Sequence, residues 1–472
     1  MITNFLRYSS LLLFLIFGGC KLVKLTPDAI LIKDVSIIDI ESGTTIPQQS
    51  ILIENGRITN IFPSGAIAYA AHTEIEATGM YVIPGLWDMH VHLRGGSALA
   101  DENKNLLPLY ITNGVTTVRE AGGDITPQIL QWKQEISENT LVGPTIFTSG
   151  PKLDGKNSTW PGSLELQSKE DVTHALDSLV ALGVEFIKIY DSTLSEEIYL
   201  EILRQAEARG LKTTGHLPMS VILDDALDAG LDGIEHLYYV LKGASGKEQE
   251  ITDLVRNGKL SFWGAVRELL DSYDEEKATK LFQKMALKKV AVTPTIYIDE
   301  VLSFLHEVDH SNDIELNYIG EEIQKTYARR LNTALKRTEA SKRFEAELHH
   351  KFKSIIKPMF DAKVMLLTGS DNGAFNSYIY AGSSLHKELE KFVESGLTPI
   401  EVLQSSIING ATFFGVQDSI GTIEIDKKGD LLILNANPLE DIKNTTTIEA
   451  VIHNGKSYSK KDLQQFFKKI AN

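Results

Sequence analysis

Eight short apolar stretches, each followed by a helical stretch, occupy the middle of this 472-residue chain. This alternation constrains the fold more than any other feature, because strands that alternate with helices pair in parallel and eight such units close into a barrel. The predicted strands lie around Tyr81 to His92, Val115 to Glu120, Thr145 to Ser149, Phe186 to Tyr190, Lys212 to His216, Gly233 to His236, Val290 to Thr295 and Met365 to Asp371. We therefore predict an α/β protein built on a (β/α)8 TIM barrel.

Amphipathic stretches between the strands predict the outer helices of this barrel, for example at Lys169 to Leu182, Ser195 to Arg209 and Thr398 to Thr412. Glycines such as Gly183 follow these stretches, as is common where a helix ends. Two longer segments, 242–289 and 309–357, exceed ordinary connections. They are helical insertions at the active-site rim or, equally, a solvated outer face.

Short β-rich segments flank the barrel on both sides. The first runs from Ala29 to Phe62 and contains Asn55-Gly56, a strong hairpin signal, and the second runs from Gly421 to Lys456. Each segment is too small for a core of its own, so we expect the two to pair. The predicted domains are therefore a composite β-sandwich from 20–83 and 413–472, and a barrel with helical insertions from 84–412.

The amino terminus carries Arg7, then the apolar run Leu11 to Phe17, then Gly18-Gly19-Cys20. This run is too short to span a bilayer. A basic residue, a short apolar core and small residues are typical of secretory signals, and the small pair before Cys20 resembles a bacterial lipoprotein signal. The resemblance implies that residues 1–19 are a signal peptide and that Cys20, the only cysteine, is acylated. We expect an exported protein anchored to a bacterial membrane on its periplasmic or cell-surface side; the alternative is a buried cysteine in an N-terminal helix.

The charge balance narrows the possible partners. The formal net charge of −16 argues against nucleic acid, because phosphate binding depends on clustered Lys and Arg. Hydrophobic residues make up 43% of the chain, which is typical of a well-packed globular protein. We therefore expect a small-molecule substrate and a membrane contact through Cys20, with homo-oligomer formation left open.

The first chemical signal is Asp88-Met89-His90-Val91-His92 at the end of an apolar run. Alternate side chains of a strand point the same way, so His90 and His92 face together. Two imidazoles at the carboxyl end of a barrel strand can chelate a divalent metal, and that end is the catalytic face. Taken alone, an H-x-H pair is a weak signal, because paired histidines also occur in cores and on surfaces.

Four further residues at later strand ends strengthen this signal. His216 and His236 end the fifth and sixth predicted strands, and Asp371 ends the eighth. Lys188 lies in the apolar fourth strand, where a buried ammonium is costly unless it is neutralised or paired. The alternatives are packing for the histidines, a core salt bridge for Lys188 and helix capping for Asp371. Each alternative is credible singly, but all six residues together at strand ends favour a metal site.

At these residues the chain resembles the amidohydrolase superfamily, within it the imidazolonepropionase-like and Xaa-Pro dipeptidase-type branch. The matching segments are IPGLWDMHVH, NGVTTVREAGG, FIKIYDS, TTGHLP, GIEHL, LLTGSDNG, GTIEIDKKGDLLIL and VIHNGK. The resemblance implies two divalent metal ions, with His90, His92 and Asp371 at a buried site and His216 and His236 at a more exposed one. It also implies that Lys188 bridges both ions as an N6-carboxylated lysine.

Two metals so held would acidify a shared water to hydroxide and polarise the scissile carbonyl, with Asp371 as catalytic base and proton carrier. Zinc suits mixed imidazole and oxygen ligands, while manganese, cobalt and iron stay open. The leading hypothesis is hydrolysis of an amide or peptide bond in a dipeptide or N-acyl amino acid. The alternatives are cyclic amide hydrolysis or deamination, and ligand capture without turnover.

Substrate specificity in such barrels belongs to the loops after the strands. Tyr238 could bind a substrate carboxylate or carbonyl, or it could pack in an aromatic rim. Arg119 could bind a carboxylate, or it could pair with Glu120 or another acid. Trp87 and Trp160 could line the pocket or pack in the core.

Overall fold

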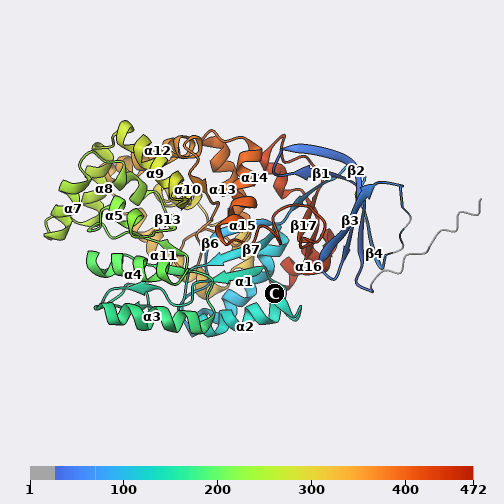
Figure 1. Cartoon of the computed structure of the whole chain (residues 1–472), viewed down its shortest axis with the longest axis horizontal. Coiled ribbons are helices and arrows are strands. Elements are labelled where there is room, and N and C mark those ends of the chain that lie inside the picture. The colour runs from blue at the N-terminus through green and yellow to red at the C-terminus, as the bar shows by residue number, and fades with distance from the viewer. Residues whose placement is uncertain (1–26, 68, 70, 471–472) are drawn as a thin grey trace, which may run out of the picture.

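The computed structural model describes residues 27–67, 69 and 71–470. The predicted signal peptide 1–19 and its Cys20 lie outside the described residues. Figure 1 shows an elongated molecule, with a barrel at its centre, a β domain at one end and added helices at the other. In the described part of the chain, no helix combines the length and apolarity needed to cross a membrane.

The barrel contains eight parallel strands, and each overlaps one of the predicted strands. Hydrogen bonds join the two arcs: the Glu185 amide donates to the Thr148 carbonyl (3.1 Å), and the Met89 amide donates to the Thr368 carbonyl (2.9 Å). The prediction of a TIM barrel is confirmed. The strands are β6 (Leu86–His92), β7 (Val115–Glu120), β8 (Thr145–Thr148), β11 (Ile187–Ile189), β12 (Thr213–Gly215), β13 (Gly233–Glu235), β14 (Ala291–Thr293) and β15 (Met365–Leu366). Three short strands extend its edges: β9 (Leu153–Asp154), β10 (Leu164–Glu165) and β16 (Asn372–Gly373).

Helices surround the barrel and cover its strands. They are α1 (Ala100–Thr112), α2 (Thr126–Ser137), α3 (Lys169–Leu182), α4 (Glu196–Ala208), α5 (Leu223–Asp228), α9 (Glu275–Leu287), α12 (Glu339–Asp361), α13 (Ser383–Glu394), α14 (Pro399–Ser406) and α15 (Ile408–Phe413), with the 3-10 turn η1 (Ser97–Leu99). Helix α3 begins at a capping box between Ser168 and Asp171 and ends at Gly183, whose φ is 72°. A Ser cap of this kind is worth about 1 kcal/mol. One predicted helix, 398–412, is in fact two, because Ile407 (φ −113°) interrupts it.

The two long segments form additional helices beyond the barrel. Besides α9 and α12, the segments contain α7 (Glu248–Arg256), α8 (Phe262–Asp271), η2 (Ile314–Tyr318) and α11 (Glu321–Ala334). Helix α6 (Tyr238–Gly243) begins just before the first segment, and α10 (Ile296–Phe304) lies between the two. Side chains from both segments, including Trp263 on α8 and Arg330 on α11, line the large cavity above the strand ends. The insertions therefore build the rim, and the reading of a purely solvated outer face is wrong.

Both ends of the chain contribute to the β domain, as predicted. Its strands are β1 (Ile30–Asp39), β2 (Thr44–Glu54), β3 (Arg57–Pro63), β4 (Thr73–Glu76), β5 (Tyr81–Pro84), β17 (Leu431–Leu434), β18 (Ile448–His453) and β19 (Lys456–Ser459). They form one hydrogen-bonded sheet in the order β19-β18-β17-β5-β1-β2-β3, with β4 also on β1, around a separate apolar cluster. In Figure 1 the blue amino-terminal strands lie beside β17 from the other end of the chain.

Two local features of this domain bear on the sequence predictions. Asn55 (φ 52°) and Gly56 (φ 72°) form the predicted hairpin turn between β2 and β3. By contrast, the stretch predicted as one strand at Tyr81 to His92 is two strands. β5 pairs with β1 and β17 in the β domain, whereas β6 enters the barrel, so the chain passes between the two units at Gly85. The turn η3 (Ile442–Thr446) precedes β18 and β19. The last helix, α16 (Lys460–Ile470), follows β19 and packs against α1.

Candidate metal centre

The six predicted metal ligands all lie on, or just beyond, barrel strands, at their carboxyl ends. His90 and His92 belong to β6 and Lys188 to β11, while His216, His236 and Asp371 follow β12, β13 and β15. Four of the six are fully enclosed, with at most 7% of the residue exposed: His90, His92, Lys188 and Asp371. Their roles as ligands stay predictions, and the geometry below describes how they are arranged.

Three side chains from β6 and the loop after β15 converge most closely. The Nε2 atoms of His90 and His92 are 3.1 Å apart, and Asp371 Oδ1 lies 3.4 Å and 2.9 Å from them. Two imidazole nitrogens and a carboxylate oxygen thus share one small volume. This is the trio that the resemblance assigns to the buried metal.

The other two histidines border the same volume from the side of the cavity. The ring of His236 lies 5.2 Å from that of His90 and 5.0 Å from that of His216. The Nδ1 atom of His216 is 2.9 Å from Asp191 Oδ1, and the Nδ1 atom of His236 is 2.7 Å from Thr295 Oγ1. These contacts hold both rings through Nδ1, which leaves each Nε2 for a metal.

Glu235 links Lys188 to His90. The Lys188 ammonium forms an ion pair with Glu235, whose Oε2 is also 3.3 Å from His90 Nδ1, and whose Oε1 accepts a hydrogen bond from Arg119 Nη2 (3.1 Å). Burial, and after it the Arg119 guanidinium, holds the pKa of Lys188 well below its usual range. Of the two roles predicted for Arg119, the structure shows pairing with an acid of the protein, here the buried Glu235.

The loop after β15 is shaped to present Asp371. Gly369 allows it to approach β6, since a Cβ there would lie 2.7 Å from that of His90. Ser370 donates both its amide (2.9 Å) and its hydroxyl (2.5 Å) to Asp88, and burial raises the pKa of Asp88 to about 7. Asp371 itself adopts a φ of 57° and His236 a φ of 65°. Such left-handed non-glycine residues are rare and costly, and they concentrate at functional sites.

The donor set suits divalent cations. Burial is the largest cause that lowers the pKa of His90, His92, His216 and His236, so neutral imidazoles prevail near neutral pH. Neutral imidazole is the form that binds metal. One nitrogen each of His90 and His236 and one oxygen of Asp371 lie within 4.8 Å of one another, close enough to share an ion. This trio includes His236, which the resemblance assigns to the more exposed ion, and its nitrogen and oxygen donors suit a divalent cation.

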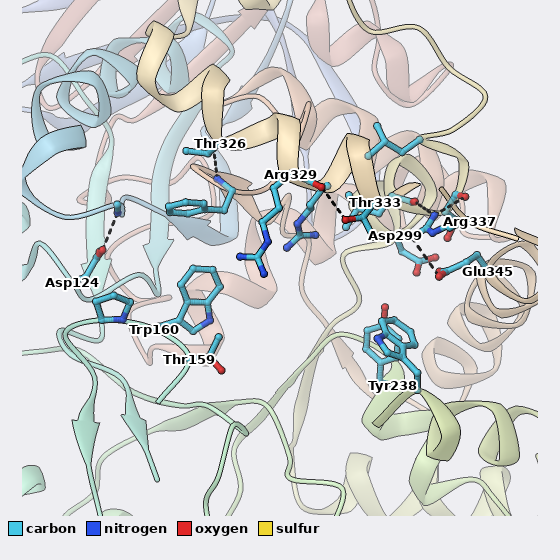
Figure 2. A pocket seen from close by; sticks show the side chains of 18 of the residues that line it. Asp124, Thr159, Trp160, Tyr238, Asp299, Thr326, Arg329, Thr333, Arg337 and Glu345 are labelled. Carbon is cyan, nitrogen blue, oxygen red and sulfur yellow. Dashed lines mark hydrogen bonds and ion pairs between the residues drawn. The ribbon is translucent and has the colours of Figure 1, made fainter. Parts of the chain in front are cut away.

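Two adjoining cavities lead to this centre. The inner cavity, about 400 Å³, is lined by His216, His236 and Asp371, and the outer one, about 780 Å³, lies between the barrel loops and the insertions. Tyr238 lines both, and its ring also packs on Trp263 (5.9 Å) and Phe352 (5.1 Å), in line with rim packing. Figure 2 shows Trp160 and Tyr238 on opposite sides of the outer cavity. Trp87 is buried in the core, 1% exposed.

Sequence reasoning missed several residues of the centre. Asp191, Glu235 and Thr295 each contact a predicted ligand, and Asn376 donates to Asp371 Oδ1 (2.8 Å). Two signals were present: an acid three residues after Lys188, and an acid within the apolar strand GIEHL. Metal-bound histidines usually donate a hydrogen bond from their second nitrogen to such groups. Acids near the strand ends therefore indicate partners for the predicted ligands.

A barrel with four histidines, an aspartate and a lysine at its carboxyl-terminal face defines the class of metal-using barrel hydrolases. The chain belongs to the amidohydrolase family, whose family model matches residues 81–458. This family generally uses a divalent metal, and two histidines and an aspartate of this chain are close enough together to share one. The family membership predicted from the sequence is confirmed.

Similar proteins support the fold and differ in activity. An adenine deaminase from Chelativorans sp. (strain BNC1) is 26% identical over 203 residues, 40% of this chain and 32% of that protein, so the chain spans about a third of that relative's length. Ochratoxinase from Aspergillus niger is 23% identical over 406 residues, 79% of this chain and 74% of that protein.

Two solved structures share the fold along almost the whole chain. Bottromycin amidohydrolase has a TM-score of 0.74 at 21% identity and covers 94% of this chain and 90% of its own. A Xaa-Pro dipeptidase with bound methionine has a TM-score of 0.67 at 20% identity and covers 91% of this chain and 100% of its own. At these identities the likeness extends to the fold alone.

Proposed function

We propose that this protein hydrolyses the amide or peptide bond of a small substrate, such as a dipeptide or an N-acyl amino acid. The observation that carries the proposal is the convergence of His90, His92 and Asp371 with His216 and His236 at an inner cavity of about 400 Å³, which adjoins the outer cavity. A cavity of that volume can enclose a small ligand almost completely. The similar proteins include a dipeptidase, which is compatible with such a substrate.

In the proposed centre the four histidines, Asp371 and a Lys188 carboxylated on its Nζ would hold two divalent ions, zinc first among them. A carboxylated lysine exchanges a costly buried ammonium for an anionic oxygen donor. The metals supply Lewis acidity, acidifying a water and polarising the substrate carbonyl. The Asp371 carboxylate would accept a proton from the attacking water and pass it to the leaving amine. Asn376 donates to Asp371 Oδ1 and keeps the carboxylate oriented (2.8 Å).

A substrate panel tests this function. The purified full-length protein, loaded with zinc, is expected to release free amines from members of a dipeptide and N-acyl amino acid panel, and to lose this activity when the metal is chelated. The measurement is amine release followed by mass identification of both products. Turnover of cyclic amides or aminopurines alone would instead support the runner-up chemistry. Tight binding without any turnover would support ligand capture.

We also propose export and membrane anchoring through Cys20, because the segment Leu11 to Cys20 has the order of a lipoprotein signal. Blocking lipoprotein signal cleavage with globomycin is expected to accumulate a larger precursor, and Cys20→Ser is expected to leave the protein unacylated. The measurements are electrophoretic mobility and the intact mass of the mature protein. An unchanged mature size under globomycin would rule out this anchor.

A further inference from the structure

Two arginines on the inserted helix α11 face the substrate cavity. Arg329 and Arg330 both line the outer cavity, and Arg330 also lines the inner one together with His216, His236 and Asp371. Figure 2 shows Arg329 extending from its helix into the hollow, across from Trp160. Within the described residues, neither guanidinium forms an ion pair with a carboxylate. A ligand in this cavity therefore meets two positive charges that no acid neutralises.

The acidic side chains of the cavities are, by contrast, already engaged. Asp299 Oδ2 lies 2.7 Å from His349 Nδ1, and Glu345 Oε1 lies 3.4 Å from Arg337 Nη2. Hydrogen bonds with Asp299 and Glu300 raise the pKa of His349 to about 9 against the opposing effect of burial, so His349 is a cation at neutral pH.

The remaining three acids are occupied as well. Asp124 Oδ2 accepts the amides of Gly95 (2.8 Å) and Gly96 (2.9 Å), while its Oδ1 has no hydrogen-bond partner among the described residues but is buried away from the cavity surface. Asp191 holds His216. Asp371 belongs to the metal centre. Among the described lining residues, the cavity thus has unpaired positive charge and no free carboxylate that could receive a substrate ammonium.

Asn376 links Arg330 to Asp371 through two hydrogen bonds. The Nη2 atom of Arg330 donates to Asn376 Oδ1 (3.1 Å), and the amide of Asn376 donates in turn to Asp371 Oδ1 (2.8 Å). One side-chain amide therefore separates the guanidinium from the carboxylate proposed to protonate the leaving nitrogen. In an amino acid, only the α-carbon separates the nitrogen from the carboxylate. The spacing suits an α-carboxylate at Arg330 with the scissile amide at Asp371.

Aromatic rings border the outer cavity beside these charges. The ring centroids of Trp160 and Phe375 are 5.8 Å apart, and the Arg94 guanidinium lies over the Trp160 ring, 4.2 Å from its centroid. Trp263 is 50% exposed and packs edge-on against Tyr238. An exposed large apolar ring at a cavity rim is well placed to cover an apolar ligand group.

We infer that the substrate is an N-acyl amino acid with an apolar or aromatic group, whose α-carboxylate binds Arg330 with Arg329 beside it. This inference rests on the proposed amide hydrolysis and narrows it. A dipeptide with a free amine would bring a second positive charge into a cavity that offers no unengaged acid. An acylated amine carries no such charge, and its carboxylate forms charge-assisted hydrogen bonds with the guanidinium groups.

A matched substrate set tests the inference on the zinc-loaded full-length enzyme. Each N-acyl amino acid, for example N-acetyl-phenylalanine, is compared with its carboxamide and with a dipeptide of the same C-terminal residue. We expect kcat/KM to be highest for the N-acyl acid. Arg330→Met is expected to lower it roughly 10- to 100-fold for the acid, mostly through KM, and to leave the carboxamide within about 3-fold. Arg330→Lys should retain part of the activity.

Lys325→Met provides the control, because Lys325 is a cation of the same helix that pairs with Glu322 at the surface. It should change neither substrate's kinetics. Equal hydrolysis of acid and carboxamide, preference for the free-amine dipeptide, or an equal loss on both substrates in Arg330→Met would overturn the inference while amide hydrolysis stands. Failure of the wild type on every amide in the set would overturn the proposed function itself.

Discussion

Replacing Lys188 by alanine is expected to reduce the metal content of the purified protein from about two equivalents to about one, and to lower kcat/KM roughly 1,000-fold. Lys188 is 1% exposed, and in the proposed centre its carboxylated form would supply oxygen ligands to the ions. Without it the second ion loses a ligand, and several kcal/mol of transition-state stabilisation are lost with that ion. Elemental analysis and steady-state kinetics on the same preparation measure both effects. Added propionate should restore part of the activity, because a free carboxylate can enter the vacated space.

The control for this variant is a buried lysine outside the metal centre. Lys242 is fully buried, and its ammonium lies 3.3 Å from Glu248 Oε1. Lys242→Met should lower the melting temperature but keep both metal equivalents and the kcat of the folded enzyme. Lys188→Ala also leaves Glu235 paired with Arg119, which limits its cost in folding. Wild-type protein with one metal and an unmodified Lys188 paired to Glu235 would contradict the two-metal proposal.

Asp371→Asn is expected to lower kcat by roughly 100- to 10,000-fold while KM changes little, because this carboxylate is the proposed proton carrier. The substitution preserves size and one oxygen, so the hydrogen bond from Asn376 can persist. Retained metal content, measured in parallel, separates loss of the base from loss of the ion. Asp371→Ala should lose metal as well, because Oδ1 lies 2.9 Å from His92 Nε2.

A buried aspartate in the β domain controls for the general cost of removing such a carboxylate. Asp430 is 4% exposed, and its Oδ1 lies 3.2 Å from His453 Nδ1. Asp430→Asn should lower the melting temperature and leave kcat unchanged. If Asp371→Asn kept more than about a tenth of the wild-type kcat with its metal in place, another group must carry the proton.

Local pattern was enough to predict the barrel and the positions of its candidate ligands. Apolar runs of strand length, followed by amphipathic helices, placed each of the eight barrel strands in the right part of the chain. In a parallel barrel every strand ends at the same face, so His216 and His236 could be placed beside His90 without knowing any distance. The pattern failed at two places. At Gly85 one apolar run forms two strands with different pairing partners, and at Ile407 one amphipathic run forms two helices.

The contacts that complete the centre could not be predicted in this way. Glu235 on β13 pairs with Lys188 on β11, across the intervening strand β12 and 47 residues apart in the chain. Asn376 accepts a hydrogen bond from Arg330, which is 46 residues away. The arginine helix α11 lies in an insertion whose position over the cavity depends on tertiary packing rather than on a strand repeat. Sequence alone thus determined the fold and the identity of the candidate ligands, because both follow from local periodicity. Tertiary structure decided which acids orient those ligands and which charges face the substrate, because these depend on side chains that meet only after folding.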